Sequence, residues 1–172
     1  VVAASVMAAY DVNVPFWSDG AVKQRWYRTP DGEPPAVDGS GQLVFAPGSV
    51  LMKSFARDGQ RLETRLLMRH PDGSWGGYTY RWRRDGSDAD LLPGSLVDGS
   101  GDRPWYFPSR GDCLRCHNGA AGTVLGGEAV QQPAHRDTGL TLDPGASLDR
   151  RARSWLHANC SFCHRPGGAT PT

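Results

Sequence analysis

The sequence predicts an α+β fold, in which an antiparallel β-rich domain over residues 1–140 precedes a helical segment over residues 141–172. Two patterns support this class. Large and polar residues alternate at a period of two through the N-terminal half, as in half-buried strands. Apolar residues recur at helical spacing only near the C-terminal end. The 22 glycines and 13 prolines indicate many turns between short elements.

The first expected strand is Lys23–Thr29, which alternates large and polar side chains. Two short apolar runs follow within Gln42–Ala56, and Pro47 and Gly48 separate them. The clearest element is a hairpin over Arg61–Arg84. Its first strand ends near Arg69, the sequence His-Pro-Asp-Gly forms the turn, and the second strand places Tyr78, Tyr80 and Trp82 on one face.

Beyond the hairpin, Leu91–Pro104 and Gly119–Gly145 are glycine- and proline-rich and are expected to be loops. The pattern then changes to that of a helix. Ser147 is the expected N-cap and Asp149 lies in the first turn. Leu148, Ala152, Trp155 and Leu156 share helical spacing, so the helix is expected to run directly into Cys160.

Composition excludes several classes of partner. The net charge is +1 and 22% of the residues are charged, which gives no reason to expect nucleic acid or an anionic membrane surface. The sequence has no run of 18 apolar residues, so we expect no transmembrane segment. The aromatic content favours a folded, turn-rich protein over a disordered one.

All four cysteines lie in two copies of Cys-x-x-Cys-His, the c-type heme attachment pattern. Two thiols at this spacing can bond to the two vinyl groups of one heme, while the next histidine ligates its iron. The pattern therefore predicts two heme c groups. The attachment and proximal residues are Cys113, Cys116 and His117 for the first heme, and Cys160, Cys163 and His164 for the second.

Two other uses of these cysteines remain open. A zinc-binding structural module also uses paired Cys-x-x-Cys motifs, although its usual spacer is roughly 15–20 residues and histidine need not follow each pair. Two redox dithiol or disulfide centres would usually accompany a thioredoxin-like βαβ pattern, which the sequence lacks. The two motifs differ in context, because a β segment precedes the first and a helix precedes the second.

Heme attachment implies export, because c-type heme is joined to protein outside the cytoplasmic membrane. We therefore expect a periplasmic or extracellular location. The apolar start VVAASVMAA is interpreted as a remnant of signal-peptide processing or the start of a fragment. Few residues follow His164, so we expect either a fragment or a second heme completed by a neighbouring cytochrome subunit.

The blocks YDVNVPFWSDGAVKQRWYRTPDG, FAPGSVLMKSF, CLRCHNGAAGTVLG and WLHANCSFCHRPGG, taken in this order with the hairpin, resemble a bacterial family of exported diheme c-type cytochromes. The resemblance implies heme c as the cofactor, but it does not imply a particular activity, because none is established for the family. The β part is also similar to the 460-type cytochromes, in which a strand lysine is cross-linked to heme, and to the β-sheet cytochromes c′. Lys53 is the residue that could match that lysine, and an ordinary solvent-facing strand lysine is the alternative.

The second axial ligand of each iron decides between functions. A low-spin electron carrier has one, whereas a gas-binding or catalytic heme leaves the position open. His135 is the candidate distal ligand, because its loop lies between the motifs. His70 is expected in an exposed turn, and His157 is expected to pack or form a hydrogen bond. The main hypothesis is electron transfer with a redox partner protein or neighbouring cytochrome subunit. The alternative is a heme enzyme or gas-binding protein acting on a small nitrogen or oxygen species at the first heme.

Overall fold

The computed structural model describes residues 6–99, 103–135 and 139–170 and divides into two compact units. Unit 1 consists of Val1–Tyr10, Ser18–Pro35 and Phe45–Leu114, and unit 2 of Asp11–Trp17, Ala36–Val44 and Arg115–Thr172. The expected division into a β-rich domain over residues 1–140 and a helical segment over residues 141–172, each carrying one heme, stays a prediction. Residues 100–102 and 136–138 of the two expected loops lie outside the described residues.

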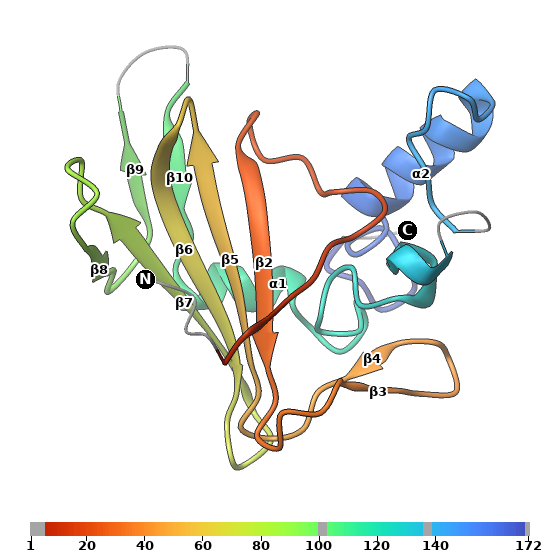
Figure 1. The fold of residues 1–172 in the computed structure, drawn as a ribbon, viewed down its shortest axis with the longest axis horizontal. Helices are drawn as coiled ribbons and strands as arrows, with labels where there is room; N and C mark the ends of the chain where they lie inside the picture. The colour runs from red at the N-terminus through yellow and green to blue at the C-terminus, as the bar shows by residue number, and fades with distance from the viewer. Residues whose placement is uncertain (1–5, 100–102, 136–138, 171–172) are drawn as a thin grey trace. The chain divides into compact units, whose positions relative to one another are not determined.

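Unit 1 contains a six-stranded antiparallel sheet in the order β1-β2-β5-β6-β7-β8, seen in Figure 1. Its strands are β1 (Ala8–Ala9), β2 (Val22–Arg28), β5 (Val50–Arg57), β6 (Gln60–Arg69), β7 (Trp75–Trp82) and β8 (Ala89–Leu91). A separate ribbon pairs β9 (Leu96–Asp98) with β10 (Trp105–Phe107), and helix α1 (Arg110–Cys116) follows it. The predicted α+β class with a β-rich N-terminal part is therefore confirmed.

The predicted hairpin is the β6–β7 pair, with Arg69 opposite Trp75 at the turn end. Strands β5 and β6 are joined by Asp58 and Gly59, which both have positive φ values of 52° and 80°. This is the geometry of a two-residue hairpin turn, for which Asp-Gly is a preferred sequence. The ribbon β9–β10 differs from the expected Leu91–Pro104 loop, because Leu96–Asp98 within that range pairs with Trp105–Phe107.

One face of the sheet holds Lys53, and we call it the lysine face. Register and the period-two alternation of strands place its members. They are Lys23, Arg25 and Tyr27 on β2, Leu51, Lys53 and Phe55 on β5, Glu63, Arg65 and Leu67 on β6, and Gly77, Thr79 and Arg81 on β7.

The core of unit 1 includes a cluster of Phe55, Trp105 and Phe107, which are at most 5% exposed. Phe55 comes from the lysine face, and the two other side chains come from β10. The rings of Phe55 and Trp105 are tilted with centroids 5.8 Å apart, a favourable aromatic arrangement. This cluster packs the β9–β10 ribbon against one end of the lysine face.

Unit 2 is built mainly from loops. It contains the short pair β3 (Ala36–Val37) and β4 (Leu43–Val44), the 3-10 turns η1 (Ala129–Gln131) and η2 (Pro133–His135), and helix α2 (Leu148–Cys160). The predicted helix and its N-cap are confirmed, since the Ser147 side chain accepts a hydrogen bond from the Arg150 amide. Among the described residues, no helix has the length and apolar character needed to cross a bilayer.

Candidate functional site

Helix α1 starts at a reciprocal cap formed by Ser109 and Asp112. The Ser109 amide donates to Asp112 Oδ2 at 3.0 Å, and the Asp112 amide donates to Ser109 Oγ at 3.2 Å. The Tyr106 hydroxyl also donates to Asp112 Oδ2, at 2.7 Å. These bonds satisfy amides at the start of a helix of only seven residues, which carries both Cys113 and Cys116.

Cys113 packs directly against the lysine face. A Cβ atom added to Gly77 would lie 2.5 Å from Cys113 Cβ and 2.8 Å from its Sγ, so only glycine permits this approach. Burial raises the pKa of the Cys113 thiol, while the positive charge of Arg65 opposes the shift. A thiol with a raised pKa is a weak redox nucleophile, which favours a structural or attachment role for it.

His117 follows α1 immediately, and its ring orientation is set by a backbone carbonyl. The distance from His117 Nδ1 to the Thr123 carbonyl oxygen is 2.7 Å. A carbonyl can only accept, so Nδ1 must carry the proton of the neutral ring and the lone pair lies on Nε2. Metal-ligating histidines use this arrangement, in which a hydrogen bond at one nitrogen fixes the tautomer that ligates through the other.

Thr123 reaches His117 through an uncommon backbone conformation. Its φ value is +58°, in the left-handed region that a β-branched residue seldom adopts. Asn118 holds the loop in this shape, because its carbonyl accepts from the Thr123 amide at 2.8 Å and its side-chain oxygen accepts from the Ala121 amide at 3.0 Å. Backbone strain of this kind is typical of functional sites, and here it aims a carbonyl at the histidine ring.

The second motif begins at the last residue of α2. The Cys163 and His164 amides both donate to the Cys160 carbonyl, at 3.1 and 2.9 Å, so the motif is a compact turn that continues from the helix. A Cβ atom on Gly168 would lie 2.2 Å from the Cys163 carbonyl oxygen, so glycine is required where the chain folds back. The Thr170 hydroxyl donates to that same carbonyl at 3.0 Å and lies 3.4 Å from His164 Nδ1.

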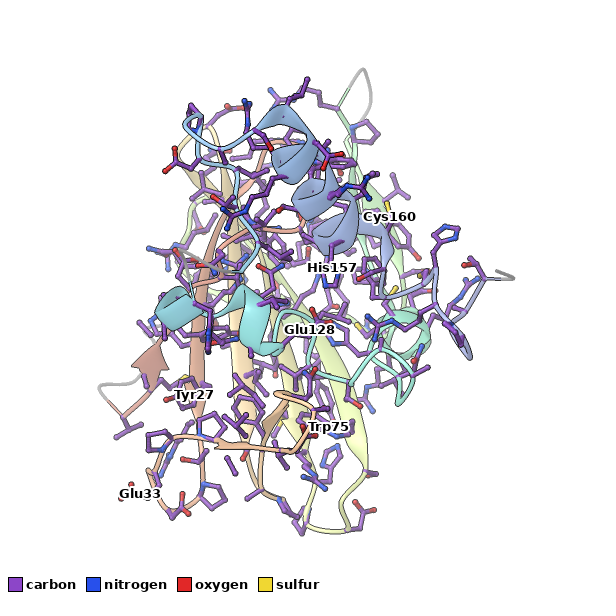
Figure 2. All side chains as sticks on the ribbon, turned by 90° about the vertical axis from the view of Figure 1, so that its right-hand side faces the viewer. Tyr27, Glu33, Trp75, Glu128, His157 and Cys160 are labelled. Atoms are coloured by element: carbon purple, nitrogen blue, oxygen red, sulfur yellow. The ribbon has the colours of Figure 1, made fainter. Side chains whose placement is uncertain are left out.

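Glu128 links the loop between the motifs to α2 (Figure 2). Its Oε2 atom lies 2.8 Å from His157 Nε2, and its Oε1 atom lies 3.5 Å from Arg165 Nη2. The hydrogen bond from His157, with the nearby charges, lowers the pKa of Glu128. Arg165 also donates to the Ala120 carbonyl at 3.0 Å, so the segments that follow the two motifs contact each other within unit 2.

The other candidates named from the sequence lie in varied surroundings. His157 forms the hydrogen bond expected of it, and His70 lies 3.2 Å from the Tyr78 hydroxyl. His135 is exposed in η2, and its role as a distal ligand stays a prediction. Lys53 is partly buried, and the choice between a heme-linked lysine and an ordinary strand lysine stays a prediction.

The four thiols form no disulfide, and each is partly buried. Over residues 6–99, 103–135 and 139–170, no three histidine, cysteine or acidic side chains gather as a group that could hold a metal ion. Sequence reasoning missed Thr123 and Asn118, although an Asn-Gly pair directly after a Cys-x-x-Cys-His motif is a turn signal that points to this loop.

Comparisons of the chain with family models, with curated proteins and with solved structures gave no match.

Proposed function

We propose that the chain is an exported diheme c-type cytochrome that transfers electrons between two covalently attached hemes. The observation that carries this proposal is the His117 ring, whose Nδ1 donates to the Thr123 carbonyl, because this bond selects the tautomer in which the lone pair lies on Nε2. Cys113 and Cys116 lie one helical turn apart on α1, immediately before this histidine. When bound, heme supplies an iron that cycles between two oxidation states.

The residues of the first motif have separate tasks in this proposal. Cys113 and Cys116 would hold the heme through thioether bonds to its two vinyl groups. His117 would ligate the iron through Nε2, while the Thr123 carbonyl keeps the ring in the tautomer that this requires. The raised pKa of Cys113 suits a thiol that is kept reduced and protonated until attachment.

The second motif supports the proposal through its placement. Cys160 ends α2, and Cys163 and His164 follow in one turn, which is a common arrangement at the start of small cytochrome c domains. Arg165, the residue after His164, binds the loop that follows His117. This contact favours two hemes close enough for electron exchange.

The other uses of the cysteines receive less support. A structural zinc site gathers four ligands within bonding distance, and the described residues offer no group of three. A redox dithiol depends on a cysteine with a lowered pKa, whereas the pKa of Cys113 is raised. Export to the periplasm or exterior, and a redox partner protein or neighbouring cytochrome subunit, belong to the same proposal.

The test is to count hemes in the chain after export in a host that matures c-type cytochromes. We expect two hemes per chain by pyridine hemochrome and intact mass. Replacing both cysteines of either motif by alanine should leave one heme, and that heme should belong to the intact motif. A wild-type chain without covalent heme in such a host contradicts the proposal.

Carbon monoxide then separates electron transfer from the enzyme or gas-binding alternative. A reduced protein in which neither heme binds CO has two ligands on each iron, as expected for an electron carrier. If the first heme binds CO, its distal position is open and the alternative replaces electron transfer. His135→Ala is the matched variant, since newly gained CO binding would identify this histidine as a distal ligand.

A further inference from the structure

Three cationic side chains form a row across the centre of the lysine face. The strand register places Arg25 directly opposite Lys53, and Lys53 directly opposite Arg65. Directly opposed side chains have Cβ atoms about 4.5–5.5 Å apart, and like charges at these positions destabilise a sheet. Lys23 lies one diagonal step from Lys53 on the same face. The sheet therefore concentrates positive charge where strand pairing alone disfavours it.

Lys53 lies at the centre of this row. Its ammonium group makes no hydrogen bond or ion pair with any other residue that the structure describes. Burial lowers the pKa of Lys53 to about 7, and the positive charges of Arg25, Lys23 and Arg65 add to the shift. Burial lowers the pKa of Lys23 to about 7 as well, with Arg25 and Arg65 adding to it. A partly buried amine among cations is in the setting that an anion stabilises most.

Glu63, the acidic residue of this face, is paired with Arg65 and Trp105 and not with Lys53. Glu63 accepts two hydrogen bonds from Arg65, at 2.5 and 2.8 Å, and one from Trp105 Nε1 at 2.9 Å. Its carboxylate is fully buried and points toward the aromatic cluster of the β10 end. It therefore compensates Arg65 and leaves Lys53 without a carboxylate partner among the described residues of this face.

The cation row lies on the same line of the sheet as Cys113, the first proposed heme-attachment cysteine. Thr79 on β7 lies directly opposite Arg65, the last cation of the row. The Cys113 thiol lies within hydrogen-bonding reach of Thr79 and packs on Gly77, two residues along β7. With strands about 4.8 Å apart, Lys53 lies about 10 Å across the sheet from Thr79. A group attached at Cys113 and extending across this face meets the cations.

We propose that Lys53 is the centre of an anion site on the lysine face, built for a carboxylate or another oxyanion, with Arg25 opposite it on one side and Arg65, which Glu63 already pairs, on the other. Ammonium and guanidinium groups together donate several charge-assisted hydrogen bonds, the interaction that carboxylates and phosphates accept best. The propionates of the first heme are one source of the anion, and this version rests on the proposed function. A free inorganic oxyanion bound beside Cys113 is the other source.

The first arm of the test measures reduction potentials in wild type, Lys53→Met and Arg28→Met. Arg28 is the matched control, because it is an exposed cation on β2 that lies on the opposite face. If the row holds a propionate, Lys53→Met lowers the potential of one heme, since a lost cation favours the oxidised and more positive iron. Arg28→Met should leave both potentials unchanged. All three proteins are first shown to carry the same number of hemes.

The second arm titrates inorganic phosphate into the same proteins at pH 6, where Lys53 carries its proton. If the site is open to free anions, wild type binds phosphate saturably, and Lys53→Met weakens binding about 10- to 100-fold because one charge-assisted bond is lost. Arg28→Met should bind as wild type does. Lys53→Arg keeps the charge, so it should retain the behaviour of wild type in whichever arm responds.

The two arms keep the anion site distinct from the heme proposal. A wild type without heme removes the propionate source, and the phosphate titration alone then decides the site. The site is refuted if Lys53→Met matches wild type in potentials and in phosphate binding while urea denaturation shows it folded. A Lys53→Arg variant that behaves like Lys53→Met in the responding arm also contradicts a role for the positive charge.

Discussion

Replacing Glu63 by glutamine tests the charge balance of the lysine face. The carboxylate is fully buried and accepts three hydrogen bonds, two from Arg65 and one from Trp105. Glutamine keeps the size but removes the charge, and one of its donors must face the Arg65 guanidinium. Breaking a buried ion pair by removing one partner costs about 3–5 kcal/mol. The Arg65 side chain is 34% exposed, so water compensates part of the loss and we expect about 3 kcal/mol.

The assay is urea denaturation followed by tryptophan fluorescence, to which Trp105 beside the substitution contributes. For an m-value of about 1–3 kcal/mol/M, a loss of about 3 kcal/mol lowers the midpoint by about 1–3 M. Asp90→Asn is the control, because the Arg83–Asp90 pair is 50% and 59% exposed and such pairs contribute about 0–1 kcal/mol. A Glu63→Gln loss no larger than that of Asp90→Asn would refute the reasoning.

Two further substitutions test the surroundings of the motifs. Gly77→Ala forces Cβ against Cys113, so we expect about 1–3 kcal/mol lower stability and incomplete attachment at the first motif by intact mass. Gly94→Ala, which meets nothing within 4 Å, should change neither quantity, and equal effects at both glycines contradict the packing argument. Glu128→Gln should destabilise the chain at neutral pH. Because the folded-state pKa of Glu128 is lowered from 4.5, the difference from wild type should persist above pH 4.5 and vanish as the pH falls through the lowered value. A difference that stays constant with pH in urea denaturation contradicts the Glu128–His157 contact.

Local signals explain what could be predicted. The β6–β7 hairpin has period-two aromatics on either side of a turn sequence, and α2 has a serine cap followed by helical spacing. Both depend on residues close in the sequence, so pattern reasoning located them correctly. The proposed heme-attachment residues are also specified locally, because five consecutive positions make up the Cys-x-x-Cys-His motif; their role stays a prediction.

The remaining features depend on register and tertiary contacts. Glu63, Thr64 and Arg65 read as a polar, solvent-facing stretch, yet Glu63 is fully buried because β10 brings Trp105 to it. The cation row is distributed over three strands, and only their pairing makes it a row. Thr123 is β-branched, a type of residue that prefers extended backbone. Its φ value is nevertheless positive, in a loop that the hydrogen bond from its amide to the Asn118 carbonyl holds.

The lysine face also determines how the protein responds to amine chemistry. Lys23 and Lys53 are the only lysines among the 19 lysine and arginine residues of the sequence. Both lysines lie on one sheet face, and both have a pKa lowered to about 7. Acylating or reductive-methylation reagents, which react with the unprotonated amine, will therefore label these side chains at neutral pH. Apart from the chain terminus, the modification pattern reports on this single surface and on whatever occupies it.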